Sequence, residues 1–242
     1  MITKNVKLAS GVALLAILMA VGMAQGAATL NVCECKVCGC HYLSIQEAIE
    51  KASPGDVILV RSGTFHGNIN VSKSITLRGE RWHGGDLPLI NADGNGSAIT
   101  VSANEARVEF VRATNSGNES GDAGIRVVSN NDTIRGNFAN DNGGSGIILE
   151  GARNCTVEAN LATNNIRGIS LTNSEGNVIF NNRLYNNTEL DAFDDGINRW
   201  DDGSSGNYYG TFNCTNEDND TICDFACNIS GGSSVDALPL VS

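Results

Sequence analysis

The fold of this protein is decided by residues 124–187, which contain three copies of one pattern: GIRVVSNNDTIRGNFANDN, GIILEGARNCTVEANLATNN and GISLTNSEGNVIFNNRLYNN. The copies start 22 residues apart, at Gly124, Gly146 and Gly168. A fixed period of this size is typical of a solenoid, in which each copy forms one coil and contacts only its neighbours. We therefore interpret the rest of the chain as lead-in, cap or attachment to this array.

Each copy alternates apolar and polar residues, first in the run that begins the copy and again in a second run after a polar turn. A period of two predicts β-strands that bury one face. The inward positions form three columns: Ile125, Ile147 and Ile169; Val127, Leu149 and Leu171; and Ile134, Val157 and Ile179. Coils stacked about 4.8 Å apart pair their backbones and share a core. The pattern predicts an all-β fold, a parallel β-helix with two strands per coil.

Asparagine repeats as regularly as the apolar residues do. One column contains Asn137, Asn160 and Asn182, and a second contains Asn142, Asn165 and Asn187. A side-chain amide offers two donors and an acceptor, so stacked amides can bond along a column, and Asn also tolerates the left-handed backbone of tight corners. We predict structural ladders. Contact with sugar is the alternative, and it requires these side chains to point outward.

Two further stretches complete a resemblance to a known family. HYLSIQEAIEKASPGDVILVRSGTFHGNINVSKSITLRG (residues 41–79) resembles the opening, and DAFDDGINRWDDGSSGNYYG (residues 191–210) the closing coil, of NosD-like proteins and of the carbohydrate-binding and sugar-hydrolase (CASH) domains. The resemblance implies a right-handed, single-stranded parallel β-helix of the secreted archaeal surface-protein type. It implies no single function, because this superfamily includes lyases, hydrolases, epimerases and copper-processing factors.

The length of 242 residues fits one solenoid of about seven coils. Ser44 precedes a run of helical periodicity that ends at Pro54, and we interpret this short helix as the N-terminal cap. Trp200 is expected to close the other end of the core. The predicted organisation is a signal peptide (1–27), a Cys-rich lead-in (28–43), the β-helix with its capping helix (44–210) and an acidic, Cys-containing C-terminal cap (211–242).

The first residues have the layout of a signal peptide, with Lys4 and Lys7 ahead of an apolar run and then small residues. An uncleaved membrane anchor is the alternative, although the apolar run is short for a span. Cleavage removes two lysines and takes the net charge from −11 to about −13. Nucleic-acid binding is excluded, because it needs a basic footprint. We predict a secreted protein of the cell surface or envelope, with no membrane span in the mature chain.

Nine N-x-S/T sequons occur in the chain, and sequons of an exported protein are acceptors for N-linked glycans where they are exposed. They lie at Asn70, Asn95, Asn118, Asn131, Asn154, Asn186, Asn213, Asn219 and Asn228. We expect glycans on turns rather than on the faces of strands.

Four cysteines precede the capping helix in a C-x-C-x-x-C-x-C arrangement, namely Cys33, Cys35, Cys38 and Cys40. Exported cysteines more often form disulfides, and Cys33 with Cys38 or Cys35 with Cys40 would close small loops. Thiolates at this density also suit a soft metal such as copper or zinc, with His41 beside them. We predict disulfides within the chain. Disulfides between chains, which would permit self-assembly, and a soft-metal site are the alternatives.

The C-terminal stretch NEDNDTICD has oxygen ligands at alternating positions and is a candidate calcium site. The ligands would be Asn216, Asp218, Asp220 and Asp224, with the backbone carbonyl of Ile222. Thr221 stands where the sharp turn of such a loop has glycine, and no Glu follows at the twelfth position. Cys214, Cys223 and Cys227 lie in or beside this stretch, so a disulfide in place of the metal is the preferred interpretation. With Cys155 these make four cysteines, so they could all pair as disulfides, or one of them could remain a free thiol.

The outward positions of the repeats carry no catalytic constellation. Their aligned residues have mixed chemistry: Arg126, Ile148 and Ser170; Val128, Glu150 and Thr172; and Arg135, Glu158 and Phe180. Polysaccharide lyases and hydrolases need clustered carboxylates, whereas this mixture indicates a solvated face with exposed ion pairs. The turn Thr114–Ala123 adds four residues to the period and is a candidate binding loop. Trp82 is expected to pack over a coil edge, with sugar stacking as the alternative.

Three functions agree with these features. The leading hypothesis is a secreted, glycosylated cell-surface β-helix with a structural or carbohydrate-interacting role, no catalysis, and carbohydrate or cell-envelope components as partners. A NosD-like copper-processing factor is the first alternative, for which only the N-terminal cysteines offer soft ligands, because all three methionines lie in the signal. A polysaccharide lyase or hydrolase is the second. Calcium, copper and zinc are the candidate cofactors, and none is assigned firmly.

Overall fold

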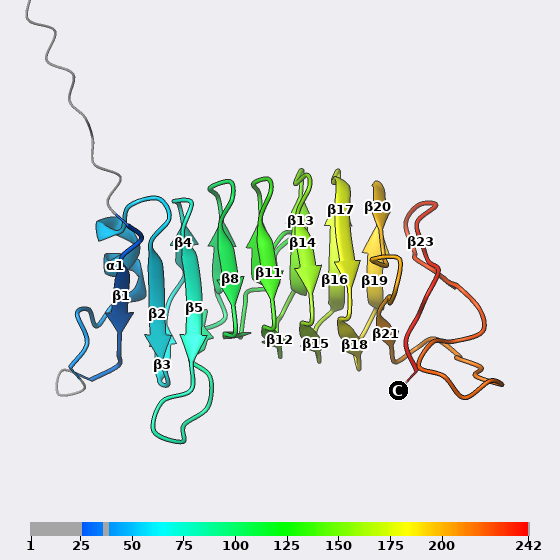
Figure 1. Cartoon of the computed structure of the whole chain (residues 1–242), viewed down its shortest axis with the longest axis horizontal. Coiled ribbons are helices and arrows are strands. Elements are labelled where there is room, and N and C mark those ends of the chain that lie inside the picture. The colour runs from blue at the N-terminus through cyan, green and yellow to red at the C-terminus, as the bar shows by residue number, and fades with distance from the viewer. Residues whose placement is uncertain (1–25, 36–38, 242) are drawn as a thin grey trace, which may run out of the picture.

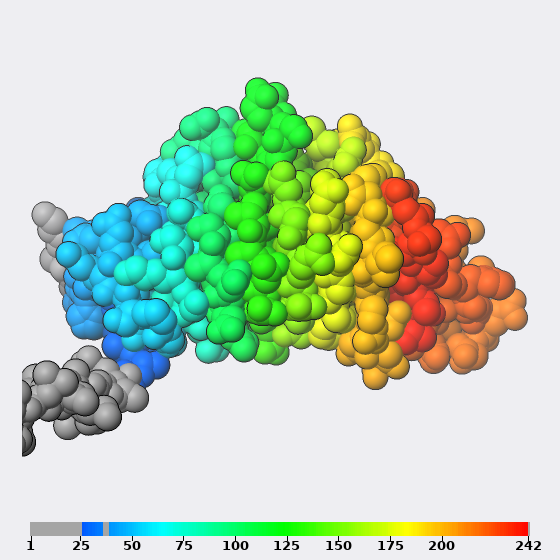
Figure 2. All heavy atoms as spheres, turned by 90° about the horizontal axis from the view of Figure 1, so that it is seen from above, coloured from blue at the N-terminus to red at the C-terminus, as the bar shows by residue number. Residues whose placement is uncertain are grey.

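The computed structural model describes residues 26–35 and 39–241, so most of the predicted signal peptide lies outside the described residues. The chain forms an elongated solenoid whose coils lie side by side from the N-terminal to the C-terminal end (Figure 1). In the space-filling view, successive colours form bands across the long axis, because each stretch of sequence fills its own slab (Figure 2). The predicted parallel β-helix of about seven coils is confirmed.

Each coil contributes one strand to each of three parallel sheets, here named A, B and C in the order in which the chain visits them. Sheet A contains β1 (Thr29–Val32), β2 (Val57–Arg61), β5 (Thr76–Glu80), β8 (Arg107–Glu109), β11 (Thr133–Arg135), β14 (Thr156–Glu158), β17 (Glu175–Phe180) and β20 (Ile197–Arg199). Sheet B contains β3 (Thr64–His66), β6 (Leu89–Asn91), β9 (Arg112–Thr114), β12 (Phe138–Asn140), β15 (Leu161–Thr163), β18 (Arg183–Tyr185) and β21 (Tyr208–Tyr209). Sheet C contains β4 (Ile69–Val71), β7 (Ile99–Val101), β10 (Ala123–Val127), β13 (Ser145–Glu150), β16 (Arg167–Thr172) and β19 (Leu190–Asp194). A short antiparallel pair, β22 (Cys227–Asn228) with β23 (Val235–Asp236), follows the last coil.

The prediction of two strands per coil is wrong, because it misses sheet B. In the three repeats the additional strands are β12, β15 and β18, each three residues long. Only the middle residue of each strand, Ala139, Ala162 or Leu184, is buried in the core. A three-residue strand is too short for an alternation to be recognised, and two of these strands carry a second apolar residue, Phe138 or Leu161, next to the buried one. The coil is therefore three-sided.

The predicted inward columns are confirmed. Ile125, Ile147 and Ile169 are paired in register along sheet C, and the neighbouring column of Val127 and two leucines follows the same register. All of these side chains are fully buried in one core cluster. Because every residue of a column has the same environment, the repeat in sequence becomes a continuous apolar stack.

Both ends of the core are closed. Helix α1 (Ile45–Lys51) begins at Ser44, whose Oγ accepts a hydrogen bond from the Glu47 backbone N–H at 3.3 Å, and it buries Ile45 and Ile49. At the other end Trp200 is fully buried, and its Nε1 donates to a carboxylate oxygen of Asp194 at 2.9 Å. The predicted capping helix and the predicted tryptophan plug are thus confirmed.

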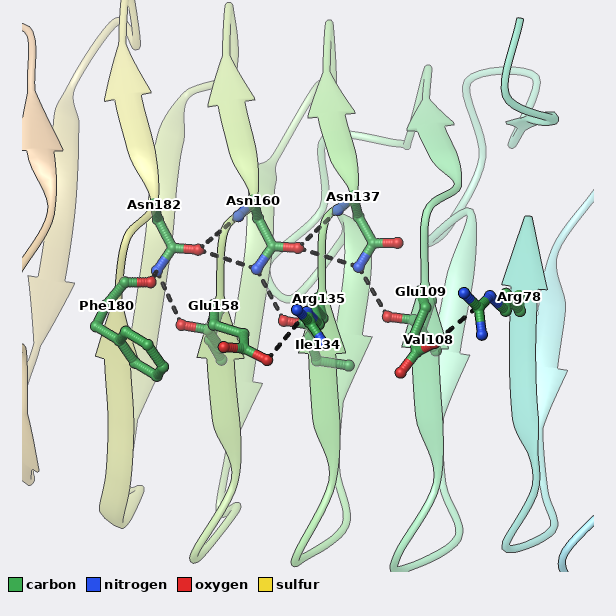
Figure 3. A network of polar contacts seen from close by, with 11 residues as sticks. Arg78, Val108, Glu109, Ile134, Arg135, Asn137, Glu158, Asn160, Phe180 and Asn182 are labelled. Carbon is green, nitrogen blue, oxygen red and sulfur yellow. Dashed lines mark hydrogen bonds and ion pairs between the residues drawn. The ribbon is translucent and has the colours of Figure 1, made fainter. Parts of the chain in front are cut away.

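The predicted asparagine ladders are present and run in one direction. In Figure 3 the Asn137 amide donates to Asn160 Oδ1 at 3.0 Å, and the Asn160 amide donates to Asn182 Oδ1 at 2.9 Å. Each backbone N–H donates to the same oxygen, as at Asn137 and Asn160. The second proton of the Asn160 amide goes to the Ile134 carbonyl of the preceding coil at 2.9 Å. Each rung therefore accepts from the coil before it and donates to the coil after it.

Each ladder ends at a buried carboxylate, which the sequence pattern did not reveal. The first ladder continues through Asn207 to Asp236, and the second passes from Asn187 to Asp191 at 2.9 Å. Asp191 and Asp236 are both buried. An ionised carboxylate only accepts hydrogen bonds, so it can receive the last amide where no further amide follows. The direction of the ladder thus requires an acceptor at its C-terminal end.

A third, shorter ladder lies near the start of the sheet A strands β17 and β20. Asn177 donates to Asn198 Oδ1 at 2.9 Å, and Asn198 donates to Asp194 Oδ1 at 2.8 Å. One coil earlier the same position is Cys155, whose backbone N–H donates to Asn177 Oδ1. This ladder escaped prediction because only two asparagines occupy the column.

Ion pairs also join successive coils on the outside of the solenoid. Figure 3 shows Arg135 beside Glu158, with 3.2 Å between Nε and Oε1, and Arg126 forms the equivalent pair with Glu150 on sheet C. In each pair the arginine lies on the earlier coil. These predicted pairs are confirmed, and each contributes little to stability because it is exposed to solvent.

Replacing Asn160 by Asp should destabilise the protein by about 3–5 kcal/mol, because a buried carboxylate oxygen would face the Asn182 and Ile134 oxygens that the amide now bonds. Chemical unfolding of Asn160→Asp and of the exposed control Asn213→Asp measures the difference. The control should unfold within about 0.5 kcal/mol of the unmodified protein. Equal stability of both variants would contradict the ladder as the support of the fold.

Candidate functional site

The longest turn from sheet B to sheet C is the loop of residues 115–122, between β9 and β10. It is held at both ends, since the Gly117 backbone N–H donates to the Gly96 carbonyl at 2.9 Å and the Ser116 N–H donates to Asn142 Oδ1 at 3.2 Å. Asp122 closes a turn within the loop, accepting from the Glu119 N–H at 3.1 Å. These bonds give the loop a defined position over sheet C.

The loop rests on a pair of glycines in the next coil. A Cβ on Gly143 would meet the carbonyl oxygen of Gly117 at 2.8 Å, and one on Gly144 would overlap the carbonyl oxygen of Asp122. The next copy has only Ile166 between Asn165 and Arg167, which pairs with Ser145, and the copy after it has Thr188-Glu189 before Leu190. The glycine pair therefore belongs to the loop and not to the repeat.

A groove of about 260 Å³ lies between this loop and the outer face of sheet C. We call it the sheet C groove. It is lined by Asn118, Glu119, Ser120, Gly121, Asp122, Gly143, Gly144, Ser145, Ile148, Ile166, Arg167, Ser170, Thr172 and Glu189. The predicted binding loop therefore forms one wall of an open, largely polar groove.

The floor of the groove combines a hydroxyl with an apolar side chain. Ile148 on β13 pairs in register with Ser170 on β16, and both point away from the core. They are nevertheless only 9% and 1% exposed, because their neighbours surround them. Phe193 continues the same column on β19.

One arginine–glutamate pair lines the groove, and a second lies beside it, where Arg126 adjoins Gly121. Arg126 donates to Glu150 through both Nε and Nη2, with the Nε contact at 3.1 Å, and Arg167 Nε donates to Glu189 Oε2 at 3.1 Å. The Arg167 guanidinium also lies 4.8 Å from the centre of the Phe193 ring. This contact fixes a planar donor above an aromatic ring. Hydroxyls, fixed charges and small apolar surfaces together suit a ligand that has many hydroxyl groups.

The N-terminal cysteines are oxidised where they are described. Cys33 and Cys40 form a disulfide, Cys35 is also disulfide-bonded, and Cys38 lies outside the described residues. The two short loops considered from the sequence did not include the pair Cys33–Cys40. That pair spans seven residues, and its Cα atoms lie 5.7 Å apart, within the range for disulfides.

The Trp82 ring lies beside this disulfide. Its face is covered by the Arg61 guanidinium at 3.5 Å from the ring centre, and Arg61 Nη1 is 3.4 Å from Cys40 Sγ. The ring therefore packs at the coil edge, as expected, with one face occupied by protein.

Four of the five candidate calcium ligands lie in a loop closed by the disulfide Cys214–Cys223, and Asp224 follows it directly. Several of their oxygens accept backbone N–H groups: Asp218 from Asp220, Asp220 from Ile222 at 2.6 Å, and Asp224 from Glu217 at 3.0 Å. The Asn216 amide donates to the Asp220 carbonyl at 3.0 Å. The predicted staple is present, and calcium binding by these residues stays a prediction.

Two thiols are free and buried, Cys155 and Cys227. Burial raises the pKa of each to about 11, with the nearby carboxylates Asp132 and Asp236 adding to the effect. Burial also raises the pKa of both aspartates themselves. A thiol that stays protonated is a poor nucleophile and a poor metal ligand. Among residues 26–35 and 39–241, no group of three or more His, Cys, Asp or Glu side chains is placed to hold a metal ion.

Residues 56–214 match the family described as periplasmic copper-binding protein (NosD). The chain belongs to the NosD family. The match covers every complete coil of the solenoid, so the resemblance to NosD-like proteins is confirmed. A comparison with curated proteins found no match. No helix in the described part of the chain is long and apolar enough to cross a membrane.

Solved structures with similar coordinates include pectate lyase Pel9A, with 16% identity and a TM-score of 0.60 over 86% of this chain and 58% of the lyase. A pectin methylesterase from carrot has 14% identity and a TM-score of 0.42 over 75% of this chain and 62% of that one. At these identities the likeness to the lyase shows the β-helix fold alone. This chain spans 58% of the lyase's length.

Gly144→Ala should displace the 115–122 loop and cost about 1–3 kcal/mol, because the added Cβ has no room beside the Asp122 carbonyl. Limited proteolysis, followed by mass spectrometry, should find faster cleavage within the loop. Gly26→Ala is the control, since a Cβ there meets nothing within 4 Å. An unchanged cleavage rate in Gly144→Ala would contradict the packing of the loop on the glycine pair.

Cys155 and Cys227 should resist iodoacetamide at pH 8 in the folded protein and react once it is unfolded in urea. With a pKa of about 11, only about one thiol in a thousand is ionised at that pH, and both sulfurs are buried. Peptide mass mapping of the two states measures this. Labelling of either cysteine in the folded protein at the rate of a free exposed thiol would contradict its buried position.

Proposed function

We propose that this protein is a secreted β-helix of the cell surface that binds carbohydrate in the sheet C groove without catalysing its cleavage. The observation that carries the proposal is the groove itself, which a loop outside the repeat builds over a rigid sheet. Rigid scaffolds with a protruding loop are where binding residues are usually found. Export, acidity and the sequons support the location.

The lining of the groove matches the chemistry of a saccharide. Ser145, Ser170 and Thr172 carry hydroxyls, and the Arg167 guanidinium, which lines the groove, offers several N–H donors. Ile148 and Ile166 offer apolar patches for the C–H faces of a sugar ring. A polar lining with a few apolar contacts fixes the orientation of a ligand rather than burying it completely.

The carboxylates near the groove support a binding role rather than catalysis. Of the lining carboxylates, Glu189 is paired with Arg167 and Asp122 accepts a backbone N–H of its own loop, so Glu119 is the remaining one; Glu150, beside the groove, is paired with Arg126. A general acid needs a proton to donate, and a general base needs a lone pair that is not already engaged. Hydrolysis of a glycosidic bond uses two carboxyl groups that face one another across the bond.

Copper handling, which the description of the family suggests, is the alternative. Its soft ligands would come from Cys33, Cys35 and Cys40 together with Cys38. Reduction of the N-terminal disulfides would be required before these sulfurs could bind Cu(I) as thiolates. One copper per chain in protein isolated from its native envelope, with four alkylatable thiols, would favour this alternative.

Arg167→Ala should weaken saccharide binding about tenfold, because it removes a charged donor worth about 1.5 kcal/mol or more. Binding is measured by affinity electrophoresis in neutral and acidic polysaccharides, with assays for reducing ends and unsaturated uronides run alongside. Arg153→Ala is the matched control, since Arg153 forms the same type of inter-coil pair with Glu175 but does not line the groove. Equal binding by both variants would place the site elsewhere. Release of sugar products would show that the protein cleaves the polysaccharide, which contradicts the proposed absence of catalysis.

A further inference from the structure

Two sets of asparagines in this chain, those of the ladders and those of the sequons, do not overlap. The nine ladder asparagines are all buried: Asn137, Asn142, Asn160, Asn165, Asn177, Asn182, Asn187, Asn198 and Asn207. The nine sequon asparagines are all exposed: Asn70, Asn95, Asn118, Asn131, Asn154, Asn186, Asn213, Asn219 and Asn228. No asparagine belongs to both sets, so attachment of a glycan at any sequon leaves the ladders intact.

The separation has a physical reason at two of the three ladder columns. The residue two places after the ladder asparagine points into the core, as Ala139 does after Asn137 and Trp200 does after Asn198. A buried apolar position does not accept serine or threonine without cost, so no sequon arises there. Sequons are left to positions where the asparagine is exposed and the third residue is not in the core, and most of these lie in turns.

The sequons on the solenoid gather around sheet C. Asn95, Asn118 and Asn186 lie in turns between sheets B and C, and Asn131 and Asn154 lie in turns between sheets C and A. Asn70 lies on β4, in sheet C itself. The remaining three sequons follow β21, and the turns that lead from sheet A to sheet B contain none. Glycans would therefore border the sheet that carries the groove.

Asn118 differs from the other sequon asparagines on the solenoid because it lines the sheet C groove. It lies in the 115–122 loop, and its exposed side chain leaves space for an enlarged group. The same loop is fixed to the neighbouring coils by hydrogen bonds from Ser116 and Gly117. A glycan on Asn118 would therefore begin at the rim of the groove, in a constant position.

We propose that the glycan attached to Asn118 occupies the sheet C groove as an intramolecular ligand, an inference that rests on the proposed saccharide-binding function. Attachment occurs in trans, from a donor sugar activated as a phosphate ester. The Asn118 Nδ2 bonds to the anomeric carbon, the bond from that carbon to the phosphate oxygen breaks, the phosphate leaves with the electron pair, and the amide nitrogen loses one proton. A ligand tethered by a short link has an effective concentration of about millimolar, so even weak binding fills the groove.

The test compares protein made in a host that performs N-glycosylation with protein made in a host that does not. Glycopeptide mapping first establishes whether Asn118 is occupied in the glycosylated form. Affinity electrophoresis in polysaccharide then compares the unmodified chain with Asn118→Gln and with Asn95→Gln. Asn95 is the matched control, since it is an exposed sequon asparagine at the same corner one coil earlier and does not line the groove.

In the glycosylated form, Asn118→Gln should bind polysaccharide about tenfold more tightly than the unmodified chain, and Asn95→Gln should bind like the unmodified chain. In the form without glycans, the unmodified chain and Asn95→Gln should bind alike and about tenfold more tightly than the glycosylated unmodified chain, whereas Asn118→Gln should bind equally whether or not the host adds glycans. Ser120→Ala removes the same sequon while keeping Asn118 and should reproduce the effect, which separates loss of the glycan from a change in the loop.

Three outcomes overturn the inference, and one of them also overturns the function it rests on. The first is that Asn118 carries no glycan in the glycosylated form, and the second is that Asn118→Gln and the unmodified chain bind equally in that form. Either outcome contradicts occupation of the groove by the glycan and leaves the proposed saccharide binding intact. Binding of no saccharide by the form without glycans contradicts the proposed function and, with it, this inference.

Discussion

A side-chain amide that accepts from one coil and donates to the next is the constraint on which this solenoid depends. Its buried polar groups bond to other groups of the protein and need no water, and the bonds fix the direction in which the coils stack. Because the bond pattern is directional, its end needs an acceptor-only group, and Asp191, Asp194 and Asp236 supply it. The C-terminal cap is therefore part of the ladder and not an appendage to it.

With the core and corners committed to repetition, function is left to the departures from the repeat. The 115–122 loop needs both its own turn and the glycines of the following coil, so the groove depends on two coils at once. The disulfides lie outside the complete coils, at the N-terminal lead-in and in the segment after β21. This division separates the parts that carry stability from the parts that are free to bind.

How much the sequence could predict follows from what recurs in it. The columns of Ile147 and Asn160 recur three times, so the coil, its core and two ladders were predictable. Sheet B was not, because a three-residue strand such as Leu161–Thr163 is too short to give a periodic signal. The enlarged turn was recognised from its extra length, but the roles of Arg167 and Phe193 were not, since neither residue type recurs in its column. The doubled glycine at Gly143 was the available signal for the groove.

Every interior rung of a ladder presents the same donors and the same acceptor to its two neighbours. A coil such as the one that contains Asn160 can therefore be copied in tandem without creating an unmatched hydrogen bond on either side. Duplication of about 22 codons would lengthen the molecule by one coil and leave both ends unchanged. The number of coils can therefore change by gene duplication, and each ladder ends at the coil that carries its terminal aspartate.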